Sequence, residues 1–376
     1  MFRSALRPIV LAVVVASFFV SAGSAQEKIE TLAIGAKAPD FALPGVDGKV
    51  HKLSDYAGAK ILVIVFTTNH CPTAQAYEDR LIQLTTDYKG KGVAVVAISP
   101  NDPKAVRLDE LGYSDVNDSL EDMKIRAKHK GFNFPYLYDG ETQKVSKAYG
   151  PVATPHVFVF DADRRLRYAG RIDDNERNPK QVKSHDTRNA IEALLAGKPV
   201  PVETTRTFGC SVKWSDKRDS VEKAFAAWAK EPVSLEPIDL NGIKELVSND
   251  TNRLRLINVW STACGPCVIE FPEFVTMNRM YRGRPFEMIG LNVNPASRAD
   301  EALSFLKDTQ ASFRNYHYAA DDVYAFIEAV DKDWLGAIPY TLLVKPGGQV
   351  LYRHMGLIDP LEIKQAIVGY LGRTYQ

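Results

Sequence analysis

The sequence predicts an α/β protein in which one unit, a central mixed sheet flanked by helices, occurs twice in tandem. When Cys71 is aligned with Cys264, the apolar run at residues 93–101 falls on residues 286–294 without a gap. In both copies, short apolar runs alternate with amphipathic segments. That alternation is typical of a partly parallel sheet covered by helices, and the repetition indicates two such sheets.

Each copy follows the same order of elements. Residues 60–66 and 254–260 are short β-branched runs, as expected of buried parallel strands. A cysteine follows each run at the start of a helical pattern, and a second buried strand comes next. Residues 154–161 then match residues 338–345 as strands that begin near a proline. A turn, another strand and a closing amphipathic helix complete each unit.

A length of 376 residues allows two domains, each with its own core. Residues 196–205 have the polar, proline-rich composition of a linker, and residues 215–232 have the pattern of a helix. We therefore expect a first domain at residues 31–214, a linker helix at 215–232 and a second domain at 233–376.

Residues 1–25 have the pattern of a secretory signal peptide. Two arginines precede an unbroken apolar run, and small residues follow it up to Ala25. The run is shorter than the roughly 20 residues that cross a bilayer, although an uncleaved membrane anchor remains the alternative. The sequence thus predicts a periplasmic or otherwise extracytoplasmic protein, in a compartment where disulfides persist.

The charge pattern bears on partners. Net charge is +1, and the lysines and arginines are spread along the chain. No basic cluster points to nucleic acid or to an anionic membrane surface, so neither is predicted as a partner.

Cys264 and Cys267 enclose Gly265 and Pro266 in a CGPC motif between a predicted strand and a predicted helix. Unpaired N–H groups and the helix dipole at such a position favour a thiolate. Cys267, one turn further on, can then resolve a mixed disulfide formed by Cys264. The motif predicts a redox-active disulfide that exchanges with protein thiols and needs no other cofactor.

Two other roles for the CGPC cysteines are less favourable. A structural bridge across so short a loop contributes about 2 kcal/mol, against about 5 kcal/mol for one joining Cys71 to Cys210. A zinc site needs further ligands, and no second CxxC or nearby histidine pair is present, so no metal is predicted.

From about residue 233 the chain resembles exported thioredoxin-fold thiol-disulfide oxidoreductases of the TlpA/ResA type, in "INVWSTACGPCVIEFPEF" and "AIPYTLLVKPGG". The resemblance implies that Pro339 is a cis-proline beside the disulfide and that Ile338 pairs with a substrate strand. It implies that Glu270 tunes the thiols and moves protons, the alternative being a solvated carboxylate. It also implies a reductase supplied by a membrane-bound electron donor.

Two residues depart from the thioredoxin pattern. Asn258 stands where thioredoxins keep a buried aspartate, so Glu270 would have to supply that proton route. Ala263 replaces the tryptophan that usually precedes the first cysteine, which removes part of the surface that faces substrates.

The first copy resembles the redoxin, or AhpC/TSA and peroxiredoxin-like, branch of the same superfamily, in "FTTNHCP" and "GCSVKW". Peroxiredoxins activate peroxide with a proline and an arginine. Here Ile64 occupies the place of that proline, and Pro155 lies where the arginine is expected.

The roles of Cys71 and Cys210 stay open at this level. Cys71 is a catalytic nucleophile resolved by Cys210, or the two form a stabilising bridge. A third alternative is that the two are independent thiols, and a fourth is that Cys71 receives electrons from Cys264 and Cys267. His70 could lower the pKa of Cys71, but a lone histidine is more often a surface or packing residue.

The predicted function is an exported thiol-disulfide oxidoreductase that reduces protein disulfides through CGPC. One alternative is an antioxidant thiol peroxidase, in which the first domain consumes peroxide and the second recharges it. Another makes the first domain a non-catalytic module that binds client proteins.

Overall fold

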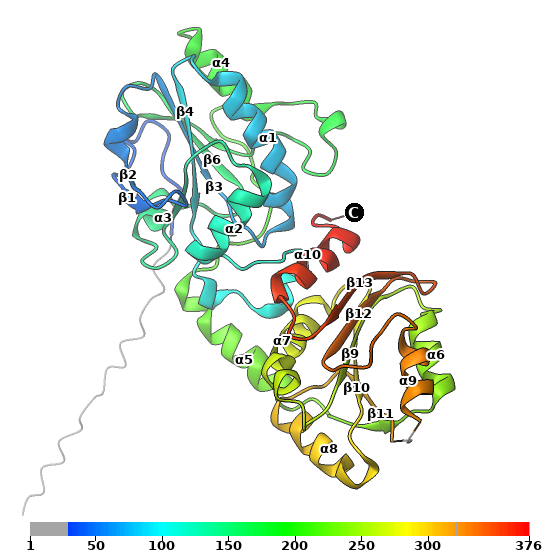
Figure 1. The fold of residues 1–376 in the computed structure, drawn as a ribbon. Helices are drawn as coiled ribbons and strands as arrows, with labels where there is room; N and C mark the ends of the chain where they lie inside the picture. Colours follow the sequence, from blue (N-terminus) through cyan, green and yellow to red (C-terminus); the bar gives the residue numbers. More distant parts are fainter. Residues whose placement is uncertain (1–28, 320–321, 376) are drawn as a thin grey trace, which may run out of the picture.

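The computed structural model describes residues 29–319 and 322–375, and in it the chain forms two α/β domains (Figure 1). The first contains a five-stranded sheet of order β5-β4-β3-β6-β7, and the second a six-stranded sheet of order β13-β12-β9-β10-β11-β8. The four strands β4-β3-β6-β7 therefore correspond to β10-β9-β12-β13. This correspondence confirms the fold class and the internal repeat.

The first sheet is built around β3, whose six residues are all buried. It pairs in parallel with β4 and antiparallel with β6, and a small hairpin packs beside the sheet. The strands of this domain are β1 (Ala42–Pro44), β2 (Val50–Lys52), β3 (Ile61–Phe66), β4 (Val93–Ser99), β5 (Tyr136–Tyr138), β6 (His156–Phe160) and β7 (Leu166–Gly170).

The second sheet is built around β9, which is buried along its whole length. It pairs in parallel with β10 and antiparallel with β12, as β3 does with β4 and β6. Its strands are β8 (Glu236–Pro237), β9 (Leu254–Trp260), β10 (Phe286–Asn292), β11 (Arg314–His317), β12 (Tyr340–Val344) and β13 (Val350–Met355).

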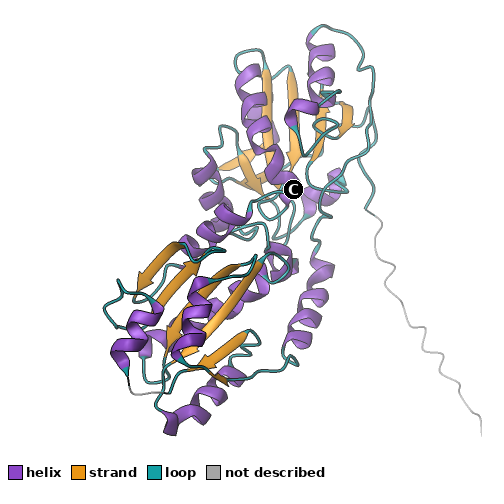
Figure 2. Cartoon of the chain, turned by 90° about the vertical axis from the view of Figure 1, so that its right-hand side faces the viewer, coloured by secondary structure: helices purple, strands orange, loops and turns teal. Residues whose placement is uncertain are grey.

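Helices cover both faces of each sheet (Figure 2). Because side chains alternate along a strand, Leu256 and Trp260 of β9 pack toward α7, whereas Ile257 and Val259 pack toward α6 and α9. The helices are α1 (Pro72–Tyr88), α2 (Leu120–Lys130), α3 (Lys144–Tyr149), α4 (Asp186–Leu195), α5 (Arg218–Trp228), α6 (Leu240–Ser248), α7 (Gly265–Tyr281), α8 (Ala299–Asp308), α9 (Val323–Val330) and α10 (Pro360–Leu371).

The proline-rich segment at residues 196–205 is not a free linker. Ala169 of β7 donates its N–H to Glu203 O at 2.9 Å, and Thr205 N donates back to Ala169 O at 3.2 Å. The segment thus follows the outer edge of the first sheet. Proline and polar residues suit an exposed sheet edge as well as a linker, so composition alone does not distinguish the two. The connection between the domains is α5 instead (Figure 1).

The two domains share part of a core. The loop between β4 and α2 carries the short helix η3 (Leu108–Leu111), and Val106 and Leu111 are buried in the same cluster as Met280 and Tyr281 of α7. Tyr281 also donates its hydroxyl to Ser114 O at 2.9 Å. We call residues 103–118 the wedge, since this part of the first domain completes the core of the second.

The C-terminal segment reaches back to the wedge. Arg373 donates two hydrogen bonds to the Asp115 carboxylate, at 2.6 and 2.8 Å. Tyr375 packs edge-on against Tyr113 with ring centres 5.0 Å apart, and the Arg284 guanidinium lies 3.8 Å from the Tyr113 ring centre. The two domains are therefore joined by ion-pair and aromatic contacts as well as by α5.

The predicted signal peptide lies outside the described residues. Among residues 29–319 and 322–375, none of the helices has the length and apolar character needed to span a bilayer.

Candidate active site

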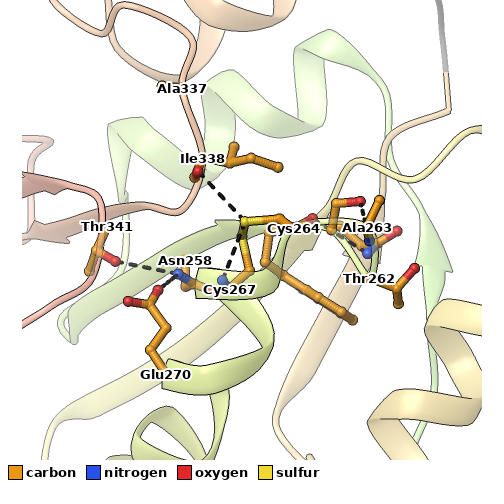
Figure 3. Close-up of a disulfide and its surroundings, with 12 residues drawn as sticks. Asn258, Thr262, Ala263, Cys264, Cys267, Glu270, Ala337, Ile338 and Thr341 are labelled. Carbon is orange, nitrogen blue, oxygen red and sulfur yellow. Dashed lines mark hydrogen bonds between the residues drawn. A yellow bond between two sulfur atoms is a disulfide. The ribbon is translucent and has the colours of Figure 1, made fainter.

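The CGPC cysteines form a disulfide at the start of α7, with Cα atoms 5.3 Å apart (Figure 3). Cys264 caps the helix, and Cys267 N lies 3.3 Å from Cys264 Sγ. Cys267 is fully buried, whereas Cys264 is partly exposed. Cys264 is therefore the sulfur that another molecule can reach.

The turn that carries Cys264 is held by Asn294, which follows β10. Asn294 Oδ1 accepts from Ser261 Oγ at 2.8 Å and from Thr262 N at 3.0 Å. Its amide nitrogen donates to Thr262 Oγ1 at 2.8 Å. Sequence reasoning did not select Asn294, although the repeat alignment pairs it with Asn101, which lies at the corresponding place in the first domain.

Pro339 and Ile338 lie beside the disulfide. The Ile338–Pro339 peptide bond is cis, and Ile338 O is 3.6 Å from Cys264 Sγ (Figure 3). Ile338 also borders a cavity of about 310 Å³ whose lining includes Tyr318, Phe326 and Trp334. A partly apolar hollow thus lies next to Ile338, the residue whose carbonyl oxygen faces Cys264.

Glu270 is buried, with 4% of its surface exposed, and is not a solvated first-turn carboxylate. Its Oε1 accepts from Asn258 Nδ2 at 3.1 Å (Figure 3). Its Oε2 accepts from Ile358 N at 3.0 Å. Burial raises the pKa of Glu270 to about 7, against the lowering effect of these two hydrogen bonds. The carboxyl group therefore changes its charge near neutral pH.

Asn258 occupies the buried position next to Glu270. Besides its bond to the carboxylate, its amide nitrogen lies 3.4 Å from Thr341 Oγ1. Its Oδ1 has no hydrogen-bond partner among the described residues. Among residues 29–319 and 322–375, the site therefore contains one buried carboxyl group, on the helix rather than on the strand.

The first domain places Cys71 at the position equivalent to Cys264, as the cap of α1. Cys71 is fully buried; its sulfur accepts from Ala74 N and from Cys210 N, both at 3.4 Å, and its thiol lies 3.2 Å from Thr154 O. The Thr154–Pro155 peptide is cis, like its counterpart in the second domain. The two sites thus share their backbone arrangement.

Cys71 and Cys210 lie side by side as free thiols. Burial opposes ionisation of Cys71, but the Cys210 thiol, the charge of His70 and nearby backbone N–H groups outweigh it and lower the pKa of Cys71 to about 6. The hydrogen bond to Cys71 and burial raise the pKa of Cys210. The pair therefore shares one proton near neutral pH.

His70 is neither a surface nor an apolar packing residue. Its Nδ1 lies 2.6 Å from Asp118 Oδ2, with both side chains buried. Asp118 precedes α2 and was not selected from the sequence. Across residues 29–319 and 322–375, no cluster of three histidine, cysteine or acidic side chains is placed to hold a metal ion.

Comparison with known proteins identifies both halves. Residues 34–169 match the AhpC/TSA family and residues 238–366 match the redoxin family. Thiol-disulfide oxidoreductase ResA of Geobacillus thermodenitrificans is 26% identical over 167 residues, covering 44% of this chain and 85% of that protein. Alkyl hydroperoxide reductase E of Mycobacterium bovis is 30% identical over 173 residues, covering 44% of this chain and 97% of that protein.

Among solved structures, an uncharacterized conserved protein from Geobacillus kaustophilus is 42% identical and covers 49% of this chain and 93% of its own, with a TM-score of 0.44. The two sheets, each with a cysteine at the start of its first long helix, define a thioredoxin-fold oxidoreductase. The chain belongs to the AhpC/TSA and redoxin family, and it carries one domain of each kind in tandem.

Proposed function

We propose that the second domain exchanges disulfides with protein substrates through Cys264 and Cys267. The observation that carries this proposal is the pairing of a partly exposed Cys264 with a fully buried Cys267 at a helix start. An incoming disulfide meets only the first sulfur, and the second is held where it resolves the intermediate.

In the reducing direction, the Cys264 thiolate attacks one sulfur of the client disulfide, and the other client sulfur leaves as a thiolate. Cys267 then loses its proton and attacks Cys264. This step forms the Cys264–Cys267 disulfide and releases the second client thiol, so that two electrons pass to the client. We assign the proton exchange to Glu270, one helical turn after Cys267, because its pKa of about 7 allows both transfers at neutral pH.

Client recognition is assigned to the backbone at Ile338 and the adjoining cavity. An extended client segment can pair with the backbone of the partly exposed Ile338, as a strand adds to a sheet edge. Exposed apolar side chains lie on the segments around the disulfide, namely Ile269 (72% exposed), Leu335 (84%) and Leu357 (51%). They suit a partly unfolded protein better than a small thiol.

We further propose that the protein acts as a reductase outside the cytoplasm, with electrons from a membrane-bound donor. The pattern of residues 1–25 and the relationship to ResA support this setting.

The activity is tested by the reduction of insulin disulfides, which is measured as the precipitation of the separated insulin chains. The Cys264→Ser chain is expected to lose at least 100-fold in rate, while Cys267→Ser accumulates a mixed disulfide with the client. A Cys71→Ser/Cys210→Ser chain is the control and should retain the rate. Wild-type speed in the Cys264→Ser chain would rule out the proposed site.

A second candidate function is thiol peroxidase activity at Cys71. The AhpC/TSA match and a Cys71 pKa of about 6 favour it, while Ile64 and Pro155 remove the expected activating residues. Peroxide consumption that disappears in Cys71→Ser would support the peroxidase. Client binding that survives in the same variant would support a binding module instead.

A further inference from the structure

A buried ion pair lies beside Cys71. His70 and Asp118 have 2% and 0% of their side chains exposed. Asp118 also accepts hydrogen bonds from Asn69 N at 2.8 Å, His70 N at 3.2 Å and Asn101 Nδ2 at 2.8 Å. Four donors converge on one carboxylate, which is the environment of an ionised group.

The charges of the pair follow from these contacts. Burial opposes the charge of Asp118, but the His70 charge and the convergent donors lower the pKa of Asp118 below its usual range. Burial likewise opposes the charge of His70, and Asp118 raises the pKa of His70. Both shifts favour the charged forms, an imidazolium next to a carboxylate, and the imidazole belongs to the residue that precedes Cys71.

Burying such a pair costs folding free energy, and apolar residues of similar volume often stabilise a fold as well or better. Buried ion pairs that perturb a neighbouring nucleophile are more typical of functional sites. Here the neighbour is a fully buried thiol capped by two backbone N–H groups. A purely structural role for the ion pair would leave its position next to this thiol unexplained.

Cys210 is held against Cys71 from a distant part of the chain. Thr154 N donates to Cys210 O at 2.9 Å, and Lys213 N donates to Asn101 Oδ1 at 2.8 Å. A Cβ on Gly209 would lie 2.0 Å from Thr154 O, so only glycine allows this approach. In the CGPC site the second sulfur, that of Cys267, lies on the helix. In the first domain Ala74 occupies the equivalent helical position, and the second sulfur comes from Cys210 in the segment 209–213.

We propose that Cys71 and Cys210 form a second dithiol–disulfide centre, in which His70 and Asp118 are positioning residues that hold Cys71 as a thiolate. The centre goes beyond the proposed function, which uses only Cys264 and Cys267. Its substrates are thiols and disulfides that reach the partly exposed Cys210.

An external thiolate attacks Cys210 in the disulfide form, and Cys71 leaves as a thiolate facing the imidazolium. A second external thiolate attacks the external sulfur of the mixed disulfide, so that an external disulfide forms and Cys210 leaves as a thiolate, which takes a proton from solvent. Two external thiols are oxidised and the centre gains two electrons; oxidation of the centre is the reverse. Because the Cys71 thiolate is stabilised in the reduced centre, its ionisation shifts the equilibrium toward the reduced form.

Several titratable groups face the centre. His70 precedes Cys71, Asp118 lies before α2, Lys213 follows Cys210, and Tyr375 of the C-terminal segment bonds to Cys210. The test therefore changes Asp118 alone and compares it with a second buried, paired carboxylate. Asp173 serves as that control because it pairs with Arg80 at 2.7 Å, away from both sulfurs.

The experiment uses the full chain with Cys264→Ser and Cys267→Ser, so that only the first-domain thiols remain. Equilibration in glutathione buffers, acid trapping and mass spectrometry should find one intramolecular Cys71–Cys210 disulfide. Thiolate absorbance at 240 nm, compared with the same chain carrying Cys71→Ser, should rise with a midpoint near pH 6. Asp118→Asn should raise that midpoint by about one unit and shift the glutathione equilibrium toward the disulfide about tenfold. Asp173→Asn should change neither.

Absence of the disulfide at every glutathione ratio, or a Cys71 midpoint above pH 8, would overturn the proposal. An unchanged midpoint in a folded Asp118→Asn chain would overturn the role of His70 and Asp118. If Asp118→Asn fails to fold, the parent chain still decides through these two measurements whether the Cys71–Cys210 centre exists, and His70→Asn replaces Asp118→Asn as the test of the ion pair. Failure here is distinguishable from failure of the proposed function, because the CGPC site is assayed separately in the Cys71→Ser/Cys210→Ser chain.

Discussion

Asn258 Nδ2 lies 3.1 Å from Glu270 Oε1, so an uncharged strand residue supports the one buried carboxyl group beside the CGPC disulfide. A strand aspartate at position 258 would place two carboxylates in contact, and one of them would have to stay protonated. With asparagine the site keeps a single titrating carboxyl group, and its behaviour can be tested without interference from a second.

Glu270→Gln should remove the pH dependence that this carboxyl group imposes on disulfide exchange. We expect the wild-type rate of insulin reduction to change with a midpoint near pH 7, the pKa of Glu270, and the variant to lack that transition. Rates measured from pH 5 to 9 with the same client decide the point. An unchanged profile in Glu270→Gln would assign the proton transfer to another group.

The same substitution has a signature in stability. The folded pKa of Glu270 is raised above its unfolded value, so the stabilisation is complete below about pH 4.5 and is lost as the pH rises through about 7. In the oxidised protein, the free energy of unfolding should fall between pH 5 and 8 by on the order of 2 kcal/mol more in wild type than in Glu270→Gln. Urea denaturation at both pH values measures this difference.

Asn258→Asp should restore the second carboxylate and raise the apparent pKa of the pair. The rate midpoint is expected to move upward by about one pH unit, because two carboxylates in contact resist full ionisation. Asn315→Asp is the matched control, since Asn315 is also a buried asparagine with an unpartnered Oδ1 among the described residues. It should lose stability at high pH but leave the midpoint in place.

Arg373→Ala should loosen the C-terminal segment. The substitution leaves the 3%-exposed Asp115 carboxylate without its arginine partner, with an expected loss of about 2 kcal/mol in unfolding free energy. Since Tyr375 bonds to Cys210, alkylation of Cys210 should also become faster. Arg298→Ala, which breaks an exposed pair with Glu301, is expected to change neither quantity. Equal effects in both variants would mean that the segment does not shield Cys210.

Much of the fold was predictable because it depends on patterns of residues that are close together in the sequence. The runs around β3 and β9 are continuously apolar, and each is followed by a cysteine at a helix start, so the repeat and the CGPC site were visible in the sequence. The contacts of Asp118 were not, because it lies far from Cys71 along the chain and no spacing rule joins the two. Asn294 and Asn101 are an intermediate case, since the repeat alignment paired them but their hydrogen bonds to the two sites depend on loop geometry.

The wedge was also invisible in the sequence. Residues 103–118 extend the loop after β4, and nothing in their composition indicates that Val106 and Leu111 are buried against another domain. Domain boundaries drawn from linkers assume that each core is contiguous in sequence. In this chain, residues 103–118 of the first domain complete the core of the second domain.

The wedge has a practical consequence for dividing the chain. A C-terminal half that starts after α5 would lack Val106 and Leu111, leaving bare apolar surface over Met280 and Tyr281. Such a fragment would tend to aggregate in isolation, and its low solubility would not represent the behaviour of the same domain in the intact chain. Supplying the N-terminal half as a separate polypeptide should rescue it, as a subunit does in a heterodimer. The two copies are thus complementary parts of one molecule, because the first supplies buried residues that the core of the second requires.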